Sequence, residues 1–437
     1  MARTRVIYQS EAVYCSQTAF NTGAASSGDI EQLSRVQSAN YSFSVARQDV
    51  NQFGNLAAID QIITESPTVS FDTSYYLANF TNEARLGFEV TKSGVKSFSS
   101  CIGNIIDSST TDYQKNYYVL TTKEGKDANE NRTAADFGAG ASIIGIGNAF
   151  LSSYSSEGAV GGLPTVSVSV EGQNMNFVNL PYNPGGAGSS NTNPVPGIKV
   201  APTSLDVVLI SGDSPAVNPS DGITIGAAVA LPAPHTDPEG AQGTAGAVST
   251  LRPGDITLTL ASQSGTWNAG GNTSTGLYQS TEASNIDNPQ GGLRYAGASI
   301  SDAHIQSYNL SFDLSRSAIQ KLGNKFSFAR AIDFPITASL SIDAVLSDLT
   351  TGSLANIINC DEKFDARVTL KDPTSCDISS SARKAMCTYL LKGLKLDSQS
   401  FSSDIGSNKT VTLDFSTQIG GPDQFAHGVF MSGAQFI

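Results

Sequence analysis

Few residues in this chain have the types and spacing that catalysis needs. Gly212–Ser214 has a faint likeness to the turn that presents a serine nucleophile, but Pro215 follows where that turn needs a glycine. A serine hydrolase also needs a histidine base and an acid that orients it. The sequence offers three histidines in all, His235, His304 and His427. We therefore predict that the chain has no catalytic residues and is not an enzyme.

Motifs for metals and cofactors are equally scarce. The sequence has no His-Glu-x-x-His pattern, no metal-spaced pairs of Cys and His and no calcium-binding loop. Gly125-Lys126 lacks the flanking residues of a phosphate-binding loop. Gly145–Gly147 is a fragment on a predicted strand or turn and is not a dinucleotide fingerprint. The acidic residues Asp361, Glu362 and Asp365 lie beside basic ones, and we interpret them as a solvated loop. We predict no metal and no cofactor.

The cysteines also show no pattern that indicates redox or metal-binding chemistry. They are Cys15, Cys101, Cys360, Cys376 and Cys387. Their number is odd, their spacing is wide and no Cys-x-x-Cys pair occurs. We expect reduced, packed thiols, and one disulfide between domains or between subunits is the alternative.

The charge balance bears on possible partners. The 437 residues carry a net charge of −13, and only 15% of them are charged. Such a chain does not grip nucleic acid, because neutralising phosphates takes Lys and Arg. An acidic wall would instead let nucleic acid slide past it. Simple solubility is the alternative reading of the same charge.

Targeting segments are not expected. No run approaches the roughly 18 apolar residues of a membrane helix. Gln9 and Glu11 interrupt any signal-peptide core near the start. We predict no membrane-spanning segment and no secretion signal.

The elements that carry these residues come in two similar sets. Gln37–Arg47 recurs as Gln306–Arg316, with a constant difference of 269 in residue number, and the register holds as far as Asn55 and Asn324. Weaker matches follow in the same order along the chain. A repeat at this distance indicates two copies of a whole domain rather than a short solenoid unit.

Alternation of apolar and polar residues predicts strands with one buried face. The predicted strands cover residues 40–45, 165–170, 309–314, 335–342 and 410–415. Further strand-like pieces lie at 204–210, 222–231 and 255–260, between the two copies. A polar cap at Ser347-Asp348 predicts a helix that continues to Ile358, and Asp404–Lys409 is predicted to be a hairpin loop.

These elements predict three parts. A first module covers residues 1–178, a Gly/Pro-rich connector with a β-rich insert covers 179–275, and a second module covers 276–437. The predicted fold class is mainly β (α+β), with two tandem β-sandwich modules and short helices.

The assembled pattern resembles the tail tube proteins of tailed bacteriophages. The likeness is carried by Arg5–Ala12, Leu163–Ser169, Gln306–Gly323 and Ser402–Val411, and it does not cover the insert. The resemblance implies modules that contribute strands to a closed inner β-barrel. It implies six modules in a ring, and rings that stack into a conduit for DNA. A fused double module implies three chains in each pseudo-hexameric ring.

The same resemblance implies a location and partners. The chain is expected to be a virion structural protein of the tail, assembled in the host cytoplasm and used for DNA ejection. Its expected partners are further copies of itself, the tape measure, the tail tip or baseplate, the terminator and, in a contractile tail, the sheath. DNA is expected to pass through the lumen without specific binding.

The repeated strands supply the candidate residues for assembly and the inner barrel. These are Asn40, Phe43, Val45, Arg47, Asn309, Phe312, Leu314, Arg316, Val166, Val168, Val411 and Leu413. A strand-rich module with an unpaired edge tends to aggregate, and closure into a ring pairs that edge.

Two other classes of protein stay open. One is another assembly protein, such as a capsid decoration protein, an adhesin or a surface-layer protein with tandem sandwich domains. The other is an extracellular carbohydrate-active or peptide-cleaving enzyme with sandwich modules, and the shortage of convergent titratable motifs weighs against it.

Overall fold

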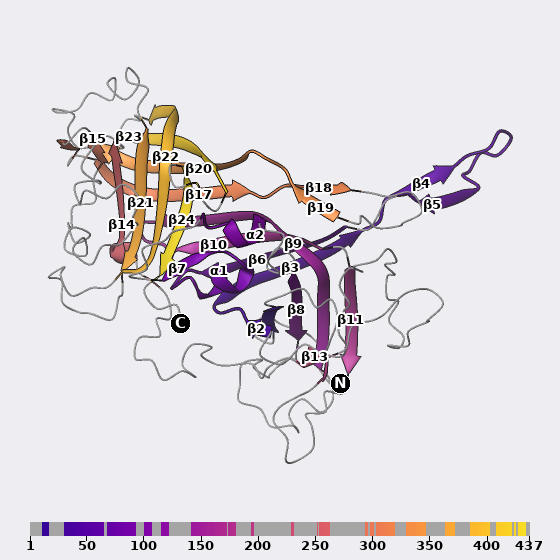
Figure 1. Ribbon diagram of the computed structural model, residues 1–437. Coiled ribbons are helices and arrows are strands. Elements are labelled where there is room, and N and C mark those ends of the chain that lie inside the picture. The colour runs from indigo at the N-terminus through magenta and orange to yellow at the C-terminus, as the bar shows by residue number, and fades with distance from the viewer. Residues whose placement is uncertain are drawn as a thin grey trace, which may run out of the picture.

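Long antiparallel strands make up almost all of the described fold, and its helices are short (Figure 1). The computed structural model describes residues 11–16, 30–64, 68–92, 100–106, 115–121, 141–172, 174–180, 194–195, 229–230, 251, 253–262, 293–295, 298–300, 303–319, 329–346, 363–371, 385–402, 408–421, 424 and 427–433. The helices are α1 (Thr81–Leu86) and α2 (Gly103–Ile106). The mainly-β fold class predicted from the sequence is confirmed.

One continuous sheet runs through the molecule, and we call it the long sheet. Each strand in it is antiparallel to its neighbours. In spatial order its strands are β3 (Val36–Ser44), β6 (Thr68–Tyr76), β10 (Thr165–Gly172), β9 (Ala141–Ala159), β17 (Ala303–Asp313), β20 (Ile336–Leu346), β23 (Thr410–Ile419) and β22 (Ala385–Ser402). The first four strands and the last four form two groups that meet where β9 pairs with β17.

The two groups have the same pairing register at their first hairpin. Phe43 lies opposite Val69 on β6, and Phe312 lies opposite Ala338 on β20, so both partners differ by 269 in residue number. The pairing register of β3 shifts between Val36 and Ser38, and that of β17 shifts between Ile305 and Ser307. These two positions also differ by 269 in residue number. The offset found in the sequence therefore persists in the hydrogen-bonded register.

The other two strands of each group also correspond. Val170 lies opposite Leu151, and Phe415 lies opposite Leu396, a difference of 245 for both partners. A β-bulge lies next to each of these pairs. Its extra residue, which has no opposite partner, is Ser152 in β9 and Asp397 in β22. A shared bulge is informative because it fixes the strand's bend and which face each side chain takes.

Each group carries an outer sheet built on the first half of its longest strand. Strand β9 pairs there with β8 (Lys115–Thr121) and β11 (Asn174–Leu180), and β22 pairs with β21 (Phe364–Lys371) and β24 (Gly428–Gly433). The first outer sheet continues through β1 (Glu11–Ser16) to β2 (Ile30–Gln32). The second continues through β14 (Ile256–Ser262) to β15 (Leu293–Tyr295) and β16 (Ala298–Ile300). In Figure 1 the two outer sheets lie at opposite ends of the long sheet.

Strand β14 bears on the predicted domain boundaries. It lies inside the range 179–275 that the sequence analysis assigned to the connector and insert, yet it pairs with β21 over seven residue pairs. Residues 256–262 thus belong to the outer sheet of the second strand group. The boundaries at 178 and 275 otherwise stay predictions. Within the same range the structure also describes a short pairing of β12 (Pro194–Val195) with β13 (Val229–Ala230).

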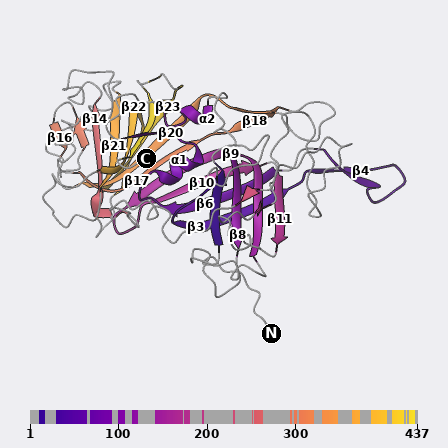
Figure 2. The ribbon, with the colours of Figure 1, turned by 60° about the horizontal axis from the view of Figure 1, so that its bottom comes forward.

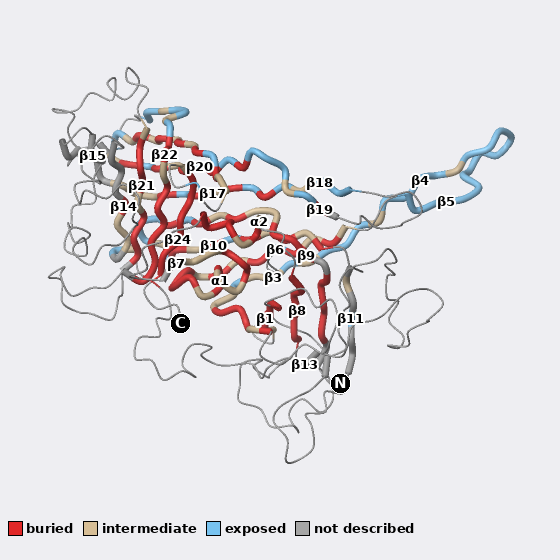
Figure 3. The backbone as a smooth tube through the Cα atoms, in the orientation of Figure 1, coloured by how far each residue is buried: buried red, intermediate tan, exposed pale blue. Residues whose placement is uncertain are grey.

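The two groups share one hydrophobic core, which the buried segments in Figure 3 trace across both of them. Strand β7 (Val90–Lys92), which follows α1, pairs in parallel with β24 of the second group. The Cys101 N–H also donates to Val429 O at 2.9 Å. Because these contacts join early and late segments of the sequence, the groups are packed as one body.

The predicted strands at 40–45, 165–170, 309–314, 335–342 and 410–415 are confirmed as β3, β10, β17, β20 and β23. Val45, Leu314 and Pro335 lie one residue outside the strands observed. Strands β22 and β23 pair as far as Ser402 and Thr410, on either side of the predicted hairpin loop. The predicted helix up to Ile358, the strand-like piece at 204–210 and the turn at Gly212–Ser214 lie outside the described residues. No helix among the described residues is long and apolar enough to cross a membrane.

Candidate assembly interface

The long sheet has one face covered by hydroxyl and acidic side chains, which we call the polar face; the opposite face is its core face. On β10 the residues alternate between buried Val166, Val168 and Val170 and the polar residues between them. The carboxylates on the polar face are Asp72, Glu157, Glu171, Asp313, Asp343 and Asp414. The described strands of the long sheet contain no arginine and two lysines, Lys392 and Lys395, both on β22. From outside the long sheet, Arg330 forms an ion pair with Glu171. The polar face is therefore acidic.

Cross-strand hydroxyl groups bind several of these carboxylates. Asp343 accepts hydrogen bonds from Ser307 Oγ at 2.8 Å and Thr412 Oγ1 at 2.6 Å. Asp414 accepts from Ser341 Oγ at 2.7 Å and Ser398 Oγ at 2.6 Å. These hydrogen bonds lower the pKa of Asp414, because they favour its ionised form. The ionised form of Asp414 is thus stabilised by hydroxyl groups on its two neighbouring strands.

The long sheet ends in two strands that have a neighbour on one side only among the described residues. Strand β3 pairs with β6, and residues 395–402 of β22 pair with β23. Both edges display a large apolar side chain at a core-face position, since Phe43 is 60% exposed and Phe401 is 50% exposed. Open edges that carry apolar side chains favour pairing with another chain.

Strand β9 meets β17 inside the chain in a pairing that we call the β9–β17 joint. It holds seven residue pairs in sequence, from Ser307 opposite Ala159 to Asp313 opposite Ser153. On its core face Phe312 stacks on Tyr154 with ring centroids 5.3 Å apart. Both rings are at most 2% exposed. On its polar face Ser155 Oγ lies 3.5 Å from Asn309 Oδ1.

A hairpin extends well away from the sheets, and we call it the arm. Strand β4 (Arg47–Val50) pairs in it with β5 (Asp60–Ile63), and both views show it projecting beyond the rest of the molecule (Figures 1 and 2). Its exposed apolar residues are Phe53, Leu56, Ile59, Ile62 and Ile63. Strands β18 (Arg316–Ile319) and β19 (Ala329–Ile332) pair at the corresponding place of the second group, again at a difference of 269. An apolar arm of this kind favours contact with another protein surface.

A buried carboxylate ties the two strand groups together. Glu83 Oε1 accepts hydrogen bonds from the hydroxyls of Tyr75 at 2.9 Å and Tyr154 at 3.1 Å. The Tyr154 hydroxyl also lies 2.6 Å from the hydroxyl of Tyr389 on β22. Burial raises the pKa of Glu83 to about 7, against the opposing effect of these hydrogen bonds. Because Glu83 is 0% exposed, it cannot meet a substrate and acts as a structural contact.

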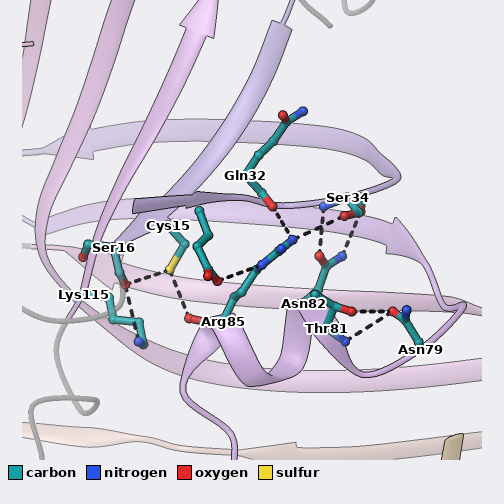
Figure 4. A network of polar contacts seen from close by, with 10 residues as sticks. Cys15, Ser16, Gln32, Ser34, Asn79, Thr81, Asn82, Arg85 and Lys115 are labelled. Carbon is teal, nitrogen blue, oxygen red and sulfur yellow. Dashed lines mark hydrogen bonds and ion pairs between the residues drawn. The ribbon is translucent and has the colours of Figure 1, made fainter. Parts of the chain in front are cut away.

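A second polar network fixes α1 against the first outer sheet (Figure 4). Arg85 Nε donates to Glu31 Oε2 at 2.9 Å, and its Nη1 donates to Gln32 O at 2.6 Å. The Asn82 amide accepts from Ser34 N at 2.9 Å and donates to Ser34 O at 2.8 Å. These bonds position α1 and with it the Glu83 carboxylate.

The candidate residues from the sequence fall into several environments. Asn40 and Asn309 lie exposed on the polar face, while Phe312 and Leu314 are buried in the chain. Buried on the core face are Val166, Val168, Val411 and Leu413. The remaining candidates lie outside the long sheet, with Val45 between β3 and the arm and Arg47 exposed on the arm. Arg316 lies on β18, where its guanidinium is 4.8 Å from the centre of the Phe150 ring. Their role in assembly stays a prediction.

Two interpretations of single residues can be compared with the structure. Asp365 is not in a solvated loop, because it lies buried on β21 and accepts a hydrogen bond from Gly393 N at 3.0 Å. Cys15, Cys101 and Cys387 are buried thiols that form no disulfide, as the packed-thiol interpretation predicts. Burial raises the pKa of Cys15 to about 11. The other two cysteines lie outside the described residues, and the described ones contain no cluster of His, Cys, Asp and Glu that could hold a metal ion.

Several important residues were missed from the sequence. Glu83 and Tyr389 are far apart along the chain, and no local pattern marks a carboxylate that turns inward. The arm residue Phe53 lies within the repeated segment and Leu56 follows directly after it. The apolar character of both residues among Gly, Asn and Gln was an available signal for an exposed contact.

Comparisons with known proteins give weak similarities. No family model matches the chain, and no curated protein matches it. One similar solved structure is the cryo-EM structure of the anti-feeding prophage baseplate, 14% identical over 32% of this chain and 85% of that chain, with a TM-score of 0.24. Another is the virion of a native gene transfer agent particle, 14% identical over 31% of this chain and 89% of that one, with a TM-score of 0.21. A crystal structure of Hcp protein is 9% identical over 28% of this chain and 73% of that one, with a TM-score of 0.15. At these scores the similarities do not indicate a function for this chain.

Proposed function

We propose that this chain is a virion structural protein that builds the tail tube of a tailed bacteriophage. Its two strand groups are two copies of one tube module, and the chain closes with further copies of itself into a ring. The observation that carries this proposal is the long sheet, with one acidic, hydroxyl-covered face and an open edge at each end.

The shared registers support the duplication. Two antiparallel hairpins and two bulges repeat at fixed differences of 269 and 245 in residue number. The backbone bonds beyond them repeat as well, since Thr64 N donates to Ala46 O and Asp333 N donates to Ser315 O. Independent folds have no reason to share register, bulge position and connecting bonds together.

The polar face supports a lumen for DNA. A wall on which carboxylates outnumber cations repels phosphate groups, so DNA passes without adhering. The hydroxyl groups keep that wall hydrated and without apolar contacts for the bases. A core face that packs against the outer sheets leaves the polar face as the side that lines the bore.

Ring closure follows from the open edges. Each chain provides eight strands of the long sheet. Three chains would form a closed barrel, and closure leaves no free edge. The arm is then free to reach a neighbouring ring, and burial of its apolar residues there would favour stacking. Other tail proteins would meet the ends of the tube.

Negative-stain electron microscopy of the purified chain, with mass measurement of the oligomer, tests this function. We expect hollow rings or tubes with three chains in each ring. Rings of six chains would keep the conduit but contradict two tube modules per chain. Dispersed chains at every concentration would contradict the tube and favour a decoration protein or an adhesin.

A further inference from the structure

The β9–β17 joint shows how one tube module meets the next within a single chain. Its core face buries Phe312 against Tyr154, and its polar face continues the hydroxyl surface from one group to the other. In this joint Ser311 lies opposite Ser155, and Leu310 lies opposite Ser156. The chain therefore contains a complete module-to-module contact, with its register fixed.

The two open edges are the structural counterparts of the two sides of this joint. Strand β3 matches β17 at a difference of 269, and β22 matches β9 at a difference of 245. The matching rests on hydrogen-bonded registers and on the same bulge positions, so it assigns a counterpart to each edge residue. Ser311 corresponds to Ser42, and Ser155 corresponds to Ser400.

We infer that β22 pairs antiparallel with β3 of a second copy of this chain, in the register of the β9–β17 joint, so that Ser400 lies opposite Ser42. The neighbouring pairs are then Ser398 with Ser44, Gln399 with Phe43, Phe401 with Tyr41, and Ser402 with Asn40. We rest this inference on the proposed ring assembly, to which it adds the contact and its register.

The side chains at the two edges fit this register. Residues 40–44 and 398–402 contain no charged group, so no like charges meet across the contact. Small polar residues from both strands lie together on the polar face and extend its hydroxyl surface. A slip of one residue would set Phe401 beside residues of the polar face of the second copy, so burial of the aromatic side chains excludes such a slip.

The aromatic residues are distributed differently in the two contacts. Inside the chain, the large Tyr154 lies opposite Phe312 and the small Ser156 lies opposite Leu310. Between chains, Gln399 takes the place of Tyr154, and Phe401 takes the place of Ser156. Phe401 therefore fills the side of the contact where the internal joint has a serine, and Tyr41 faces it. Gln399 Nε2 is buried without a hydrogen-bond partner among the described residues, at the position that faces Phe43 of the second copy.

Disulfide cross-linking tests the register directly. The test variant is the full-length chain with Ser42→Cys and Ser400→Cys, and Asn40→Cys with Ser402→Cys is a second pair in the same register. Directly opposite Cα atoms in an antiparallel pair are about 4.5–5.5 Å apart, and diagonal positions are about 7–8 Å apart. A disulfide needs roughly 4.4–6.8 Å, so opposite pairs should form at least about tenfold more cross-link than diagonal ones.

The diagonal controls are Ser42→Cys combined with Ser398→Cys, and Ser42→Cys combined with Ser402→Cys. The unmodified chain and the Ser42→Cys single variant measure any cross-linking through the native thiols. All these positions are polar or exposed edge residues, and circular dichroism of each reduced variant checks that it folds. The readout is a denaturing gel after mild oxidation, beside electron microscopy of the same sample.

We expect both opposite pairs to give cross-linked species that end at three chains. Dominant cross-linking of a diagonal control would overturn the register while β3 still met β22. Rings without any of these cross-links would overturn the β3–β22 contact and leave the proposed function standing. Folded variants that show neither rings nor cross-links would overturn both.

Discussion

The buried Glu83 makes a quantitative prediction about pH. Its carboxylate bonds to Tyr75 and Tyr154 and through the latter contacts Tyr389, so it lies between the two strand groups. Burial raises its pKa from 4.5 to about 7, which means that folding favours the neutral acid. The perturbation is Glu83→Gln, which keeps an acceptor at the same place and cannot ionise.

The sign and size follow from proton linkage. Because the pKa in the folded state is above that in the unfolded state, the stabilising contribution is fully present below pH 4.5 and is lost as pH rises through about 7. A pKa change of this size corresponds to about 3 kcal/mol of unfolding free energy. The unmodified chain should therefore lose about 3 kcal/mol relative to the Glu83→Gln variant between pH 4.5 and pH 8.

Urea unfolding at constant ionic strength, from pH 4.5 to pH 8, measures this difference. The concentration must keep the chain monomeric, because association adds stability of its own. Comparing the variant with the unmodified chain removes the effect of groups that titrate equally in both. One such group is Asp414, whose pKa is lowered in the folded chain. Its contribution to stability is therefore present above its ordinary pKa of 3.8 and is lost as the pH falls below that value. A difference in unfolding free energy that stays constant over this range would refute the reasoning.

Three further predictions concern assembly and the thiols. Phe43→Asp should abolish rings and change the unfolding free energy by less than about 0.5 kcal/mol, because Phe43 is exposed. Phe312→Asp should lower the unfolding free energy of the monomer by more than about 3 kcal/mol, because Phe312 is buried. Urea unfolding measures the stability of both variants, and electron microscopy shows whether they form rings. Equal effects of the two would contradict the difference in burial. Phe53→Ser with Leu56→Ser should leave rings but shorten the tubes seen by electron microscopy, and full-length tubes would exclude a stacking role for the arm. The Cys15 thiol should resist alkylation in the native chain and react after unfolding, as followed by mass spectrometry; rapid native labelling would contradict its burial.

The repeat in the sequence predicted strands well because a strand's buried face leaves a local pattern. Alternation at 40–45 and 309–314 marks which side chains share a face, and both segments are strands in the structure. The same pattern cannot tell Phe43 from Phe312. Their difference in burial depends on β9, which covers Phe312, whereas no described strand takes that place beside Phe43.

Pairing over long distances was the main feature that the sequence could not show. Strand β14 was predicted as a strand near Asp255–Leu260, but its partner Phe364–Lys371 lies more than a hundred residues later. Neither segment has a sequence feature that identifies the other as its partner, since many strands with alternating residues could pair with either of them. Helix α1 and its inward-facing Glu83 were missed because the helix is only six residues long. So short a helix has little periodic pattern.

The β9–β17 joint also has a consequence for the kinetics and mass action of assembly. In a ring of three chains, three of the six contacts between modules are already made when each chain folds. The equilibrium concentration of rings then varies with the third power of the free chain concentration, where six separate modules would give the sixth power. Assembly needs fewer encounters, each with its loss of translational and rotational freedom. A fused chain can therefore build its ring at a lower concentration than the separate modules could, with no stronger contact between them.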